Sequence, residues 1–233
     1  NPSGRLYTGE ELKKIYDAAA SRNIYVLVDE AYSDFVIDSG FRSMADIVPS
    51  KKGIIVINSL SKNFGMSGWR IGYVIANKNE INALLKVNQH LITCAPTLLL
   101  MYLSRYFDDI LKVTIPQVKE VVNKRNRVLS MMKSIGLDYL DGGTTFYFFV
   151  NIGKFPGSSL ELSLHLLLNF NISVSPGSAY GENTDRFIRI SIGTESDERI
   201  YIALQTINDV LHEDNFDKNE LNSKLLNRGF HLF

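Results

Sequence analysis

The sequence has little of what several large classes of protein require. One cysteine, Cys94, is present among 233 residues, so the chain can form no internal disulfide and no thiolate metal cluster, which fits a reducing cytoplasm. The four histidines are scattered without the spacing of metal ligands. Because 25 basic residues balance 25 acidic ones, no broad field of either sign draws the chain to nucleic acid or a membrane surface. We therefore expect no metal, nucleic acid or membrane among its partners.

Long hydrophobic runs are also missing. The most apolar stretch, residues 91–103, is interrupted by Thr93, Pro96 and Thr97 and is shorter than the roughly 20 residues that a membrane span needs, so we interpret it as a buried helix. The chain begins Asn1-Pro2-Ser3-Gly4, with neither an initiator methionine nor the pattern of a signal peptide. We expect it to be part of something longer.

What the sequence does contain is a 45% share of hydrophobic residues, enough for a buried core, in alternating helical and strand patterns. The first part predicts a helix over 9–22, opened by the capping box of Thr8 and Glu11, and strands over 24–28, 53–58 and 71–76. The apolarity of the first strand favours a parallel strand covered on both faces. The link from the second strand to the third is too short for a helical crossover, so an antiparallel pair and a mixed edge both stay open.

The second part of the chain predicts a different arrangement. Residues 78–135 have a largely helical pattern, broken at Pro96 and near Pro116, and Gly142-Gly143 marks a junction. Strands follow over 146–152, 172–175 and 187–192, helices over 158–170 and 196–211, and a polar tail over 213–233. The predicted class is α/β: a large domain with a mostly parallel sheet over 1–141, followed by a small α+β domain over 142–233.

Residues 59–72, Ser-Leu-Ser-Lys-Asn-Phe-Gly-Met-Ser-Gly-Trp-Arg-Ile-Gly, are the most informative stretch. One lysine, Lys62, lies among small and hydroxyl residues, with Arg70 eight positions later. A solvated surface turn is the plain alternative. Phe64, Met66 and Trp69 favour instead a loop that closes over a bound group. Because the stretch follows the second strand, it lies at the sheet edge where α/β proteins bind ligands.

This segment resembles the cofactor-lysine signature of class I/II aminotransferases, which are fold-type I pyridoxal-phosphate enzymes of the aspartate aminotransferase superfamily. Asp29-Glu30-Ala31-Tyr32 and Asn1-Pro2-Ser3-Gly4 precede it in the family's order, and 145–147 and 186–191 resemble later landmarks. The resemblance implies transfer of an amino group between a 2-amino acid and a 2-oxo acid, with pyridoxal 5′-phosphate as cofactor and a homodimeric full-length protein. It also implies that this chain is a carboxyl-terminal portion without the amino-terminal half, and poorly active alone.

The resemblance assigns cofactor roles to individual residues. Lys62 would hold pyridoxal phosphate as a Schiff base and then move a proton from the substrate's α-carbon. Asp29 would keep the pyridine nitrogen protonated, and Tyr32 and Asn1 would both donate to the 3′ oxygen. A strand-end cap for Asp29 and a core position for Tyr32 are the plain alternatives.

The resemblance also assigns residues to two anions. Arg70 and Ser59, with Ser61 as a weaker candidate, would bind the 5′ phosphate, although Arg70 could instead pair with an acidic surface group and Ser59 could be a turn residue. Arg189 would grip the substrate α-carboxylate. A solvent-facing charge is the plain alternative for Arg189, and Arg186 takes over its role if the register is shifted.

Two further functions stay open at this point. The same lysine, aspartate and arginine set serves the family's lyases, decarboxylases and carbon-carbon-bond-forming synthases. Some bacterial transcription regulators fuse a winged helix-turn-helix to an aminotransferase-like sensor domain, and a basic segment upstream of Asn1 would distinguish that case.

Overall fold

The computed structural model describes residues 1–36, 40–140, 142–153, 155–212 and 216–230. They form two compact units: the first unit is Leu6–Glu120, and the second unit joins Asn1–Arg5 to Val121–Phe233. The boundary falls inside helix α5 (Thr97–Ser134), earlier than the predicted junction at Gly142-Gly143. The division into domains 1–141 and 142–233 stays a prediction about the intact protein.

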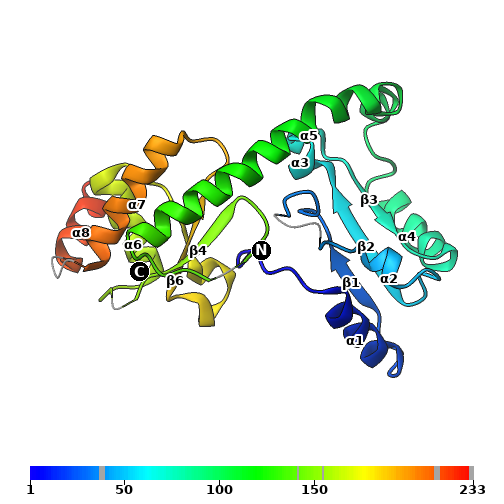
Figure 1. The fold of residues 1–233 in the computed structure, drawn as a ribbon, viewed down its shortest axis with the longest axis horizontal. Helices are drawn as coiled ribbons and strands as arrows, with labels where there is room; N and C mark the ends of the chain where they lie inside the picture. The colour runs from blue at the N-terminus through cyan, green and yellow to red at the C-terminus, as the bar shows by residue number, and fades with distance from the viewer. Residues whose placement is uncertain (37–39, 141, 154, 213–215, 231–233) are drawn as a thin grey trace. The chain divides into compact units, whose positions relative to one another are not determined.

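The first unit contains a three-stranded sheet in the order β1-β2-β3 (Figure 1). Strand β1 (Val26–Asp29) runs parallel to β2 (Ile54–Ser59), and β2 runs antiparallel to β3 (Gly72–Ile75). The strands β2 and β3 are therefore antiparallel neighbours, and because β1 is parallel to β2 they form the antiparallel part of a mixed sheet.

One face of this sheet is covered by helices. Helix α1 (Gly9–Ala20) begins at the predicted capping box, and α2 (Met44–Ile47) begins at Ser43. Both helices contribute to a core that contains Ile54 and Val56 of β2. On the opposite face Leu27 is 63% exposed, so the prediction that β1 is covered on both faces is wrong for the residues described.

Three more helices follow in the first unit: α3 (Leu60–Asn63), the short 3₁₀ helix η1 (Ser67–Trp69) and α4 (Lys78–Leu91). The predicted break at Pro96 is confirmed, because α5 begins at Thr97. The predicted break near Pro116 is wrong. Proline removes one helical hydrogen bond, yet α5 continues through it, and its non-helical backbone lies at Tyr106 (φ −119°).

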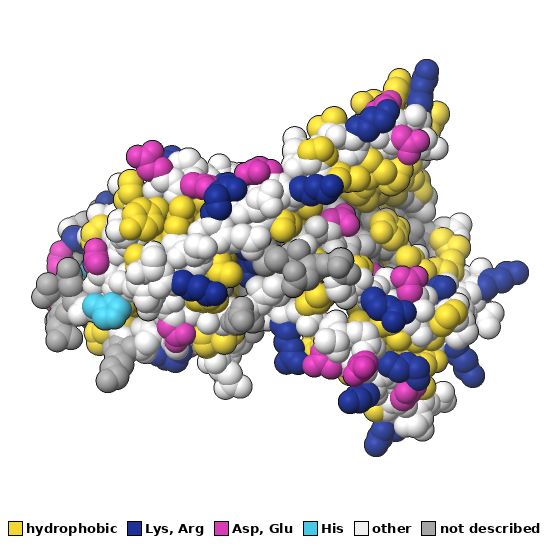
Figure 2. Space-filling model, in the orientation of Figure 1, with side chains coloured by type: hydrophobic (Ala, Val, Ile, Leu, Met, Phe, Trp, Pro, Cys, Tyr) yellow, Lys and Arg dark blue, Asp and Glu magenta, His cyan; other side chains and the backbone are white. Residues whose placement is uncertain are grey.

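Residues 91–103 are mostly not buried, which corrects the earlier interpretation. Leu91 is 77% exposed and Leu98 78%, while Leu103 is buried, because only one side of this stretch contacts the rest of the first unit. Figure 2 shows hydrophobic side chains gathered on the surface near the start of α5. Within the described ranges, no helix is both long and apolar enough to cross a membrane.

The second unit has an antiparallel sheet in the order β4-β6-β5. Its strands are β4 (Tyr147–Asn151), β5 (Ser175–Pro176) and β6 (Phe187–Ser191), and its larger helices are α6 (Ser159–Phe170) and α7 (Asp197–His212). Two short 3₁₀ helices, η2 (Gly177–Tyr180) and η3 (Glu182–Thr184), join β5 to β6. The alternation of β6 sends Ile188 and Ile190 into the core.

Helix α8 (Lys218–Leu226) was not foreseen in the polar tail. Asp217 caps it, and Leu221 and Leu225, one turn apart, are buried. Two apolar residues at this spacing are enough to attach a short helix to a core, but too few to stand out in a polar sequence.

Candidate functional site

The segments that carry the expected cofactor residues meet at one edge of the first unit's sheet. Asp29 is opposite Ile57 in the parallel pair, so β1 and β2 end side by side, and Glu30 N donates to Ile57 O at 2.8 Å. Ser59 is opposite Gly72, which brings the segment after Arg70 to the same edge. The strand register thus brings the turn after β1 to the same edge as the two segments that follow β2 and precede β3.

Lys62 lies in the single turn of α3, directly after β2. Ser59 caps this turn, its Oγ accepting a hydrogen bond from Ser61 N at 3.2 Å. The chain then reverses at Gly65, whose φ of +64° is readily adopted only by glycine and whose N donates to Lys62 O at 3.2 Å. Lys62 itself is half-buried. Short capped turns of this kind fix the backbone from which the lysine amine projects.

The loop after Lys62 is anchored to the first unit by its apolar residues, and its closure over a bound group stays a prediction. Phe64, Met66 and Trp69 pack against a small cluster of Leu60, Ile71 and Leu103. Two ring contacts attach the loop to α5: Phe64 with Phe107 at 5.8 Å, and Trp69 with Tyr102 at 5.7 Å between centroids. This loop is therefore packed against the first unit and is not a freely solvated turn.

Asp29 and Tyr32 lie in the turn that follows β1. Asp29 is exposed, and its Oδ1 accepts a hydrogen bond from Ala31 N at 2.9 Å, which is the strand-end cap considered as the alternative. This cap uses one carboxylate oxygen and orients the side chain. Tyr32 is half-buried, with its ring 6.2 Å from that of Phe35.

Arg70 has a left-handed backbone conformation, with φ 57° and ψ 42°. Such values are uncommon for a residue other than glycine and cluster at functional sites. Its Nη1 donates to Ser67 O at 2.8 Å, so its contact is with a backbone carbonyl and keeps the guanidinium against its own loop. The side chain is exposed and carries a fixed positive charge to the sheet edge.

A buried polar cluster behind the lysine turn was missed by sequence analysis. Ser33 Oγ accepts hydrogen bonds from Asn58 Nδ2 at 3.4 Å and Asn63 Nδ2 at 3.5 Å, and both asparagines are only 7% exposed. These contacts join the turn after β1 to β2 and to the residue next to Lys62. An asparagine in the apolar strand β2 was the available signal.

The same cluster lines a cavity of about 420 Å³, together with Asp34 and Tyr73. Burial raises the pKa of Asp34, and burial followed by the charges of Asp34 and Glu30 raises the pKa of Tyr73. Both shifts favour the protonated forms of these two side chains.

In the second unit, Arg189 of β6 contacts Asn1 at the start of the chain. Arg189 Nη1 donates to Asn1 Oδ1 at 3.2 Å, and Nη2 donates to Ser175 Oγ at 3.4 Å. The guanidinium carbon also lies 4.2 Å from the ring centroid of Tyr147 and 5.0 Å from that of Tyr180. Arg189 is thus half-buried among specific partners and is not simply a solvent-facing charge.

Arg186, the alternative to Arg189, makes a different set of contacts. Its guanidinium donates to the backbone carbonyls of Gly157 at 3.1 Å and Phe155 at 3.0 Å, and to that of Gly153. Three carbonyl acceptors from one loop indicate that Arg186 holds the segment between β4 and α6. This geometry favours Arg189 for binding a ligand.

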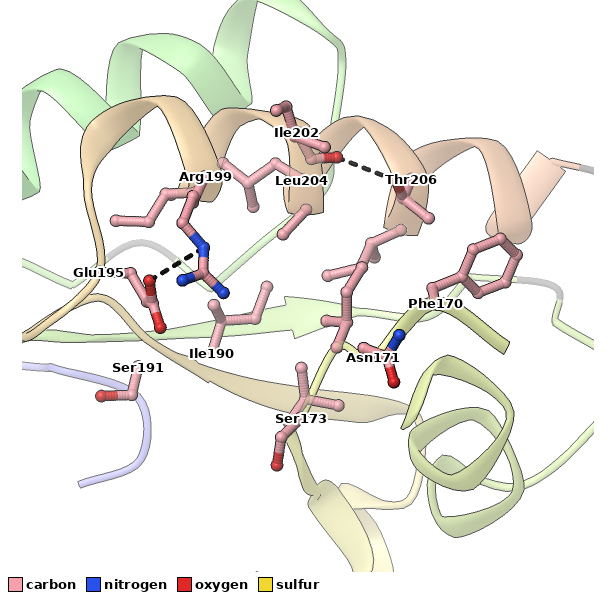
Figure 3. A pocket seen from close by; sticks show the side chains of 15 residues that line it. Phe170, Asn171, Ser173, Ile190, Ser191, Glu195, Arg199, Ile202, Leu204 and Thr206 are labelled. Atoms are coloured by element: carbon pink, nitrogen blue, oxygen red, sulfur yellow. Dashed lines mark hydrogen bonds and ion pairs between the residues drawn. The ribbon is translucent and has the colours of Figure 1, made fainter. Parts of the chain in front are cut away.

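A separate pocket of about 490 Å³ lies in the second unit between α7 and the segment from Phe170 to Val174 (Figure 3). Its lining is mostly apolar, with the Glu195–Arg199 ion pair (3.2 Å) at one end. None of the eight residues expected to bind cofactor or substrate lines it. The candidate site is therefore defined by chemistry and strand register, not by this pocket.

A known protein family matches most of the chain. Residues 1–207 match the family model described as aminotransferase class I and II. The chain belongs to this family. In this aminotransferase-family chain, six of the eight residues expected to bind cofactor or substrate lie in the first unit. The other two, Asn1 and Arg189, lie in the second unit.

Two similar proteins are named as aminotransferases. YugH of Bacillus subtilis, an aminotransferase by name, is 33% identical over 217 residues, 91% of this chain and 55% of its own length. The aspartate aminotransferase of Thermotoga maritima is 30% identical over 212 residues, which are 91% of this chain and 54% of that protein.

Solved structures show the same fold. The crystal structure of an aspartate aminotransferase from Thermotoga maritima superposes with a TM-score of 0.79 at 30% identity, covering 91% of this chain and 54% of that one. An aromatic aminotransferase from Pyrococcus horikoshii gives a TM-score of 0.82 at 27% identity, covering 95% and 58%. The chain thus has the aminotransferase fold and spans about half the length of the relatives it matches.

Proposed function

We propose that this chain is the part of a pyridoxal-phosphate-dependent aminotransferase that carries the cofactor lysine, Lys62. The observation that supports it most directly is the strand register in the first unit. Asp29, the Ser59–Lys62 turn and the segment after Arg70 belong to one sheet edge, in a chain whose family membership is established.

The residues at this edge fit the chemistry of the proposed cofactor. A phosphate dianion requires fixed cations and hydroxyl donors, which Arg70, Ser59 and Ser61 would supply. A protonated pyridine nitrogen requires a carboxylate, which Asp29 would supply from a turn already oriented by Ala31 N. Tyr32 would donate to the 3′ oxygen, and the same role for Asn1 stays a prediction from the family resemblance.

When bound, pyridoxal phosphate supplies an aldehyde carbon and an electron sink for the reaction. The protein's own contribution then centres on Lys62, whose Nζ would take the proton from the substrate's α-carbon after losing its own proton. The apolar packing of Phe64, Met66 and Trp69 supports this role, because it holds the lysine turn in place. Precise placement of a base contributes strongly to the rate of proton transfer.

Arg189 would bind the α-carboxylate of the 2-amino acid or 2-oxo acid. Its planar guanidinium suits a bidentate carboxylate contact, and its position among Asn1, Ser175 and two tyrosine rings limits its orientations. A homodimeric intact protein in the cytoplasm stays a prediction from the family resemblance and the single cysteine.

An assay of the products of transfer, decarboxylation and elimination tests this function and separates it from decarboxylases and lyases. The 233-residue chain is incubated with pyridoxal phosphate, single L-amino acids and 2-oxoglutarate, and amino-group transfer, carbon dioxide and ammonia are measured together. We expect slow formation of glutamate and a new 2-oxo acid, absent in Lys62→Arg. Because the chain spans only about half of its relatives, we expect a rate far below that of a complete aminotransferase.

Two results would contradict the proposal. Carbon dioxide or ammonia release without amino-group transfer would place the chain among decarboxylases or lyases. Transfer that is equal in the wild type and Lys62→Arg would show that the lysine is not the group involved.

A further inference from the structure

We propose that Tyr180 and Tyr147 are positioning residues that hold the guanidinium of Arg189 in the orientation needed to receive a carboxylate. This inference deepens the proposed function and rests on it for the identity of the ligand. All groups concerned lie in the second unit.

The strand register puts an aromatic surface beside Arg189. Residues 188 and 190 of β6 point into the core, so Arg189 points to the opposite face. Arg189 is opposite Phe149 of β4 and Ser175 of β5, and Tyr147 is two positions along β4 on the same face. The rings of Tyr147 and Tyr180 approach the guanidinium carbon at 4.2 Å and 5.0 Å. Both distances are within the range of a cation–π contact.

Tyr180 is itself held in place by a chain of rings. Its ring meets that of Phe149 edge-on, at 5.9 Å and 89°, and Phe149 stacks on Phe187 at 4.7 Å and 10°. Phe149 is only 1% exposed, so this chain is part of the packed sheet face. Rings fixed in this way can restrict a neighbouring guanidinium, whereas a freely rotating ring could not.

The turn that carries Tyr180 is also fixed. It begins at Gly177, where a Cβ atom would collide with the backbone oxygens of Thr184 and Phe187. The close approach ties η2 to the start of β6, two residues before Arg189. The position of the Tyr180 ring therefore follows from the backbone of the same strand that carries the arginine.

A restrained guanidinium matters because an arginine side chain has many rotamers, and fixing it on ligand binding reduces affinity. Asn1 and Ser175 contact the two Nη atoms at 3.2 Å and 3.4 Å, and the rings restrict the plane. Together they preorganise the group before a carboxylate arrives. The ring of Tyr180, not its hydroxyl, is the part that this role requires.

The test uses the whole 233-residue chain and the Nε–H resonance of Arg189 in NMR spectra, assigned by its loss in Arg189→Lys. We compare wild type, Tyr180→Phe, Tyr180→Leu and, as a matched control, Tyr201→Leu on α7, whose hydroxyl accepts a hydrogen bond from Gln205 at 2.9 Å. Side-chain order and chemical shift are measured first, and succinate is then titrated as the carboxylate probe.

We expect wild type, Tyr180→Phe and Tyr201→Leu to share an ordered, ring-shifted Arg189 signal and a succinate Kd within about twofold of one another. In Tyr180→Leu the signal should lose its ring shift and order, and succinate should bind about three- to tenfold more weakly. An unchanged order and Kd in Tyr180→Leu would overturn the inference while leaving Arg189 as the carboxylate residue. If succinate leaves the wild-type Arg189 signal unmoved, the carboxylate role itself fails and the inference fails with it.

Discussion

Asn1 and Arg189 are joined by a hydrogen bond from Arg189 Nη1 to Asn1 Oδ1, at 3.2 Å, although 188 positions separate them in the sequence. The contact makes the start of the chain part of the surroundings of the arginine on β6. Substitutions at Asn1 should therefore change ligand binding through Arg189.

The first prediction concerns Asn1→Asp. A carboxylate at this position would pair with the guanidinium and compete with a carboxylate ligand, so the succinate Kd should rise about tenfold, which corresponds to about 1.4 kcal/mol. Asn1→Ser, which keeps a neutral polar group, is the control and should change the Kd much less. Titration by NMR measures both. An equal Kd for Asn1→Asp and wild type would show that the ligand does not use Arg189.

The second prediction distinguishes the role of Arg186, which directly precedes β6, from that of Arg189, which lies on β6. Arg186→Gln removes donors from the carbonyls of Gly157, Phe155 and Gly153, and should lower the free energy of unfolding by about 1–3 kcal/mol. Its succinate Kd should stay close to that of the wild type. Arg189→Gln should instead raise the succinate Kd and leave the free energy of unfolding close to that of the wild type. Denaturant unfolding and NMR titration of both variants test this, and an exchanged pattern would reassign the carboxylate role to Arg186.

The third prediction concerns Arg125 of α5, which is 2% exposed. Its guanidinium donates to Tyr147 O at 2.6 Å and to Gly142 O, and its carbon lies 4.2 Å from the ring centroid of Phe148. Arg125→Met should lower the free energy of unfolding by about 2–4 kcal/mol, because buried carbonyls lose their donors.

Arg127, two residues later on the same helix, provides the control for Arg125. Its ion pair with Asp197 is 2.5 Å long but partly exposed, so Arg127→Met should cost less than about 1 kcal/mol. Urea unfolding gives both values. Equal losses in the two variants would mean that the carbonyl contacts of Arg125 add no stability.

The fourth prediction concerns pH and Glu161, which completes the capping box of α6 and pairs with Lys218 at 2.7 Å. Burial acts to raise its pKa, but hydrogen bonds from Lys218 and from Ser158 outweigh burial and hold the pKa below its ordinary value of 4.5. A depressed pKa means that the folded state favours the charged carboxylate. Its stabilisation is therefore fully present above pH 4.5 and is lost as the pH falls through the folded-state pKa.

Glu161→Gln tests this pH dependence. At pH 7 the variant should be less stable than the wild type by about 0.5–1 kcal/mol, and the difference should shrink as the pH falls below 4.5. Lys218→Met, which removes the ion pair with Glu161, should reproduce part of this loss of stability. Thermal or urea unfolding across the pH range measures it, and a difference that does not depend on pH would contradict the assignment.

The elements that position the candidate site could be predicted where the pattern is long or chemically distinct. The capping box of Thr8 and Glu11 predicted the start of α1, and apolar runs predicted the strands that end near Asp29 and Ser59. Turn α3 has only four residues, too few for helical periodicity to appear. Exposure also depends on what covers a strand, so the apolar Leu27 gave no sign that it is 63% exposed.

The surroundings of the expected site residues were harder to predict. The family resemblance singled out Arg189, but the rings beside it depend on which residues of β4 and β5 are opposite, and alternation alone does not fix a register. Likewise, Ser33 and Asn63 are 30 positions apart, and only the folded turn brings them together. Pro116 shows the reverse problem, because a local rule predicted a break where α5 stays helical, while the non-helical residue of α5 is Tyr106.

The most direct test of the account is to locate the covalent attachment of pyridoxal phosphate. The chain is incubated with the cofactor and reduced with borohydride, which converts the lysine adduct to a stable secondary amine, and the modified residue is identified by peptide mass spectrometry. The account predicts modification concentrated at Lys62 and lost in Lys62→Arg, with the other lysines labelled only at the level seen in the unfolded chain. Labelling spread evenly over the lysines, or unchanged in Lys62→Arg, would contradict it.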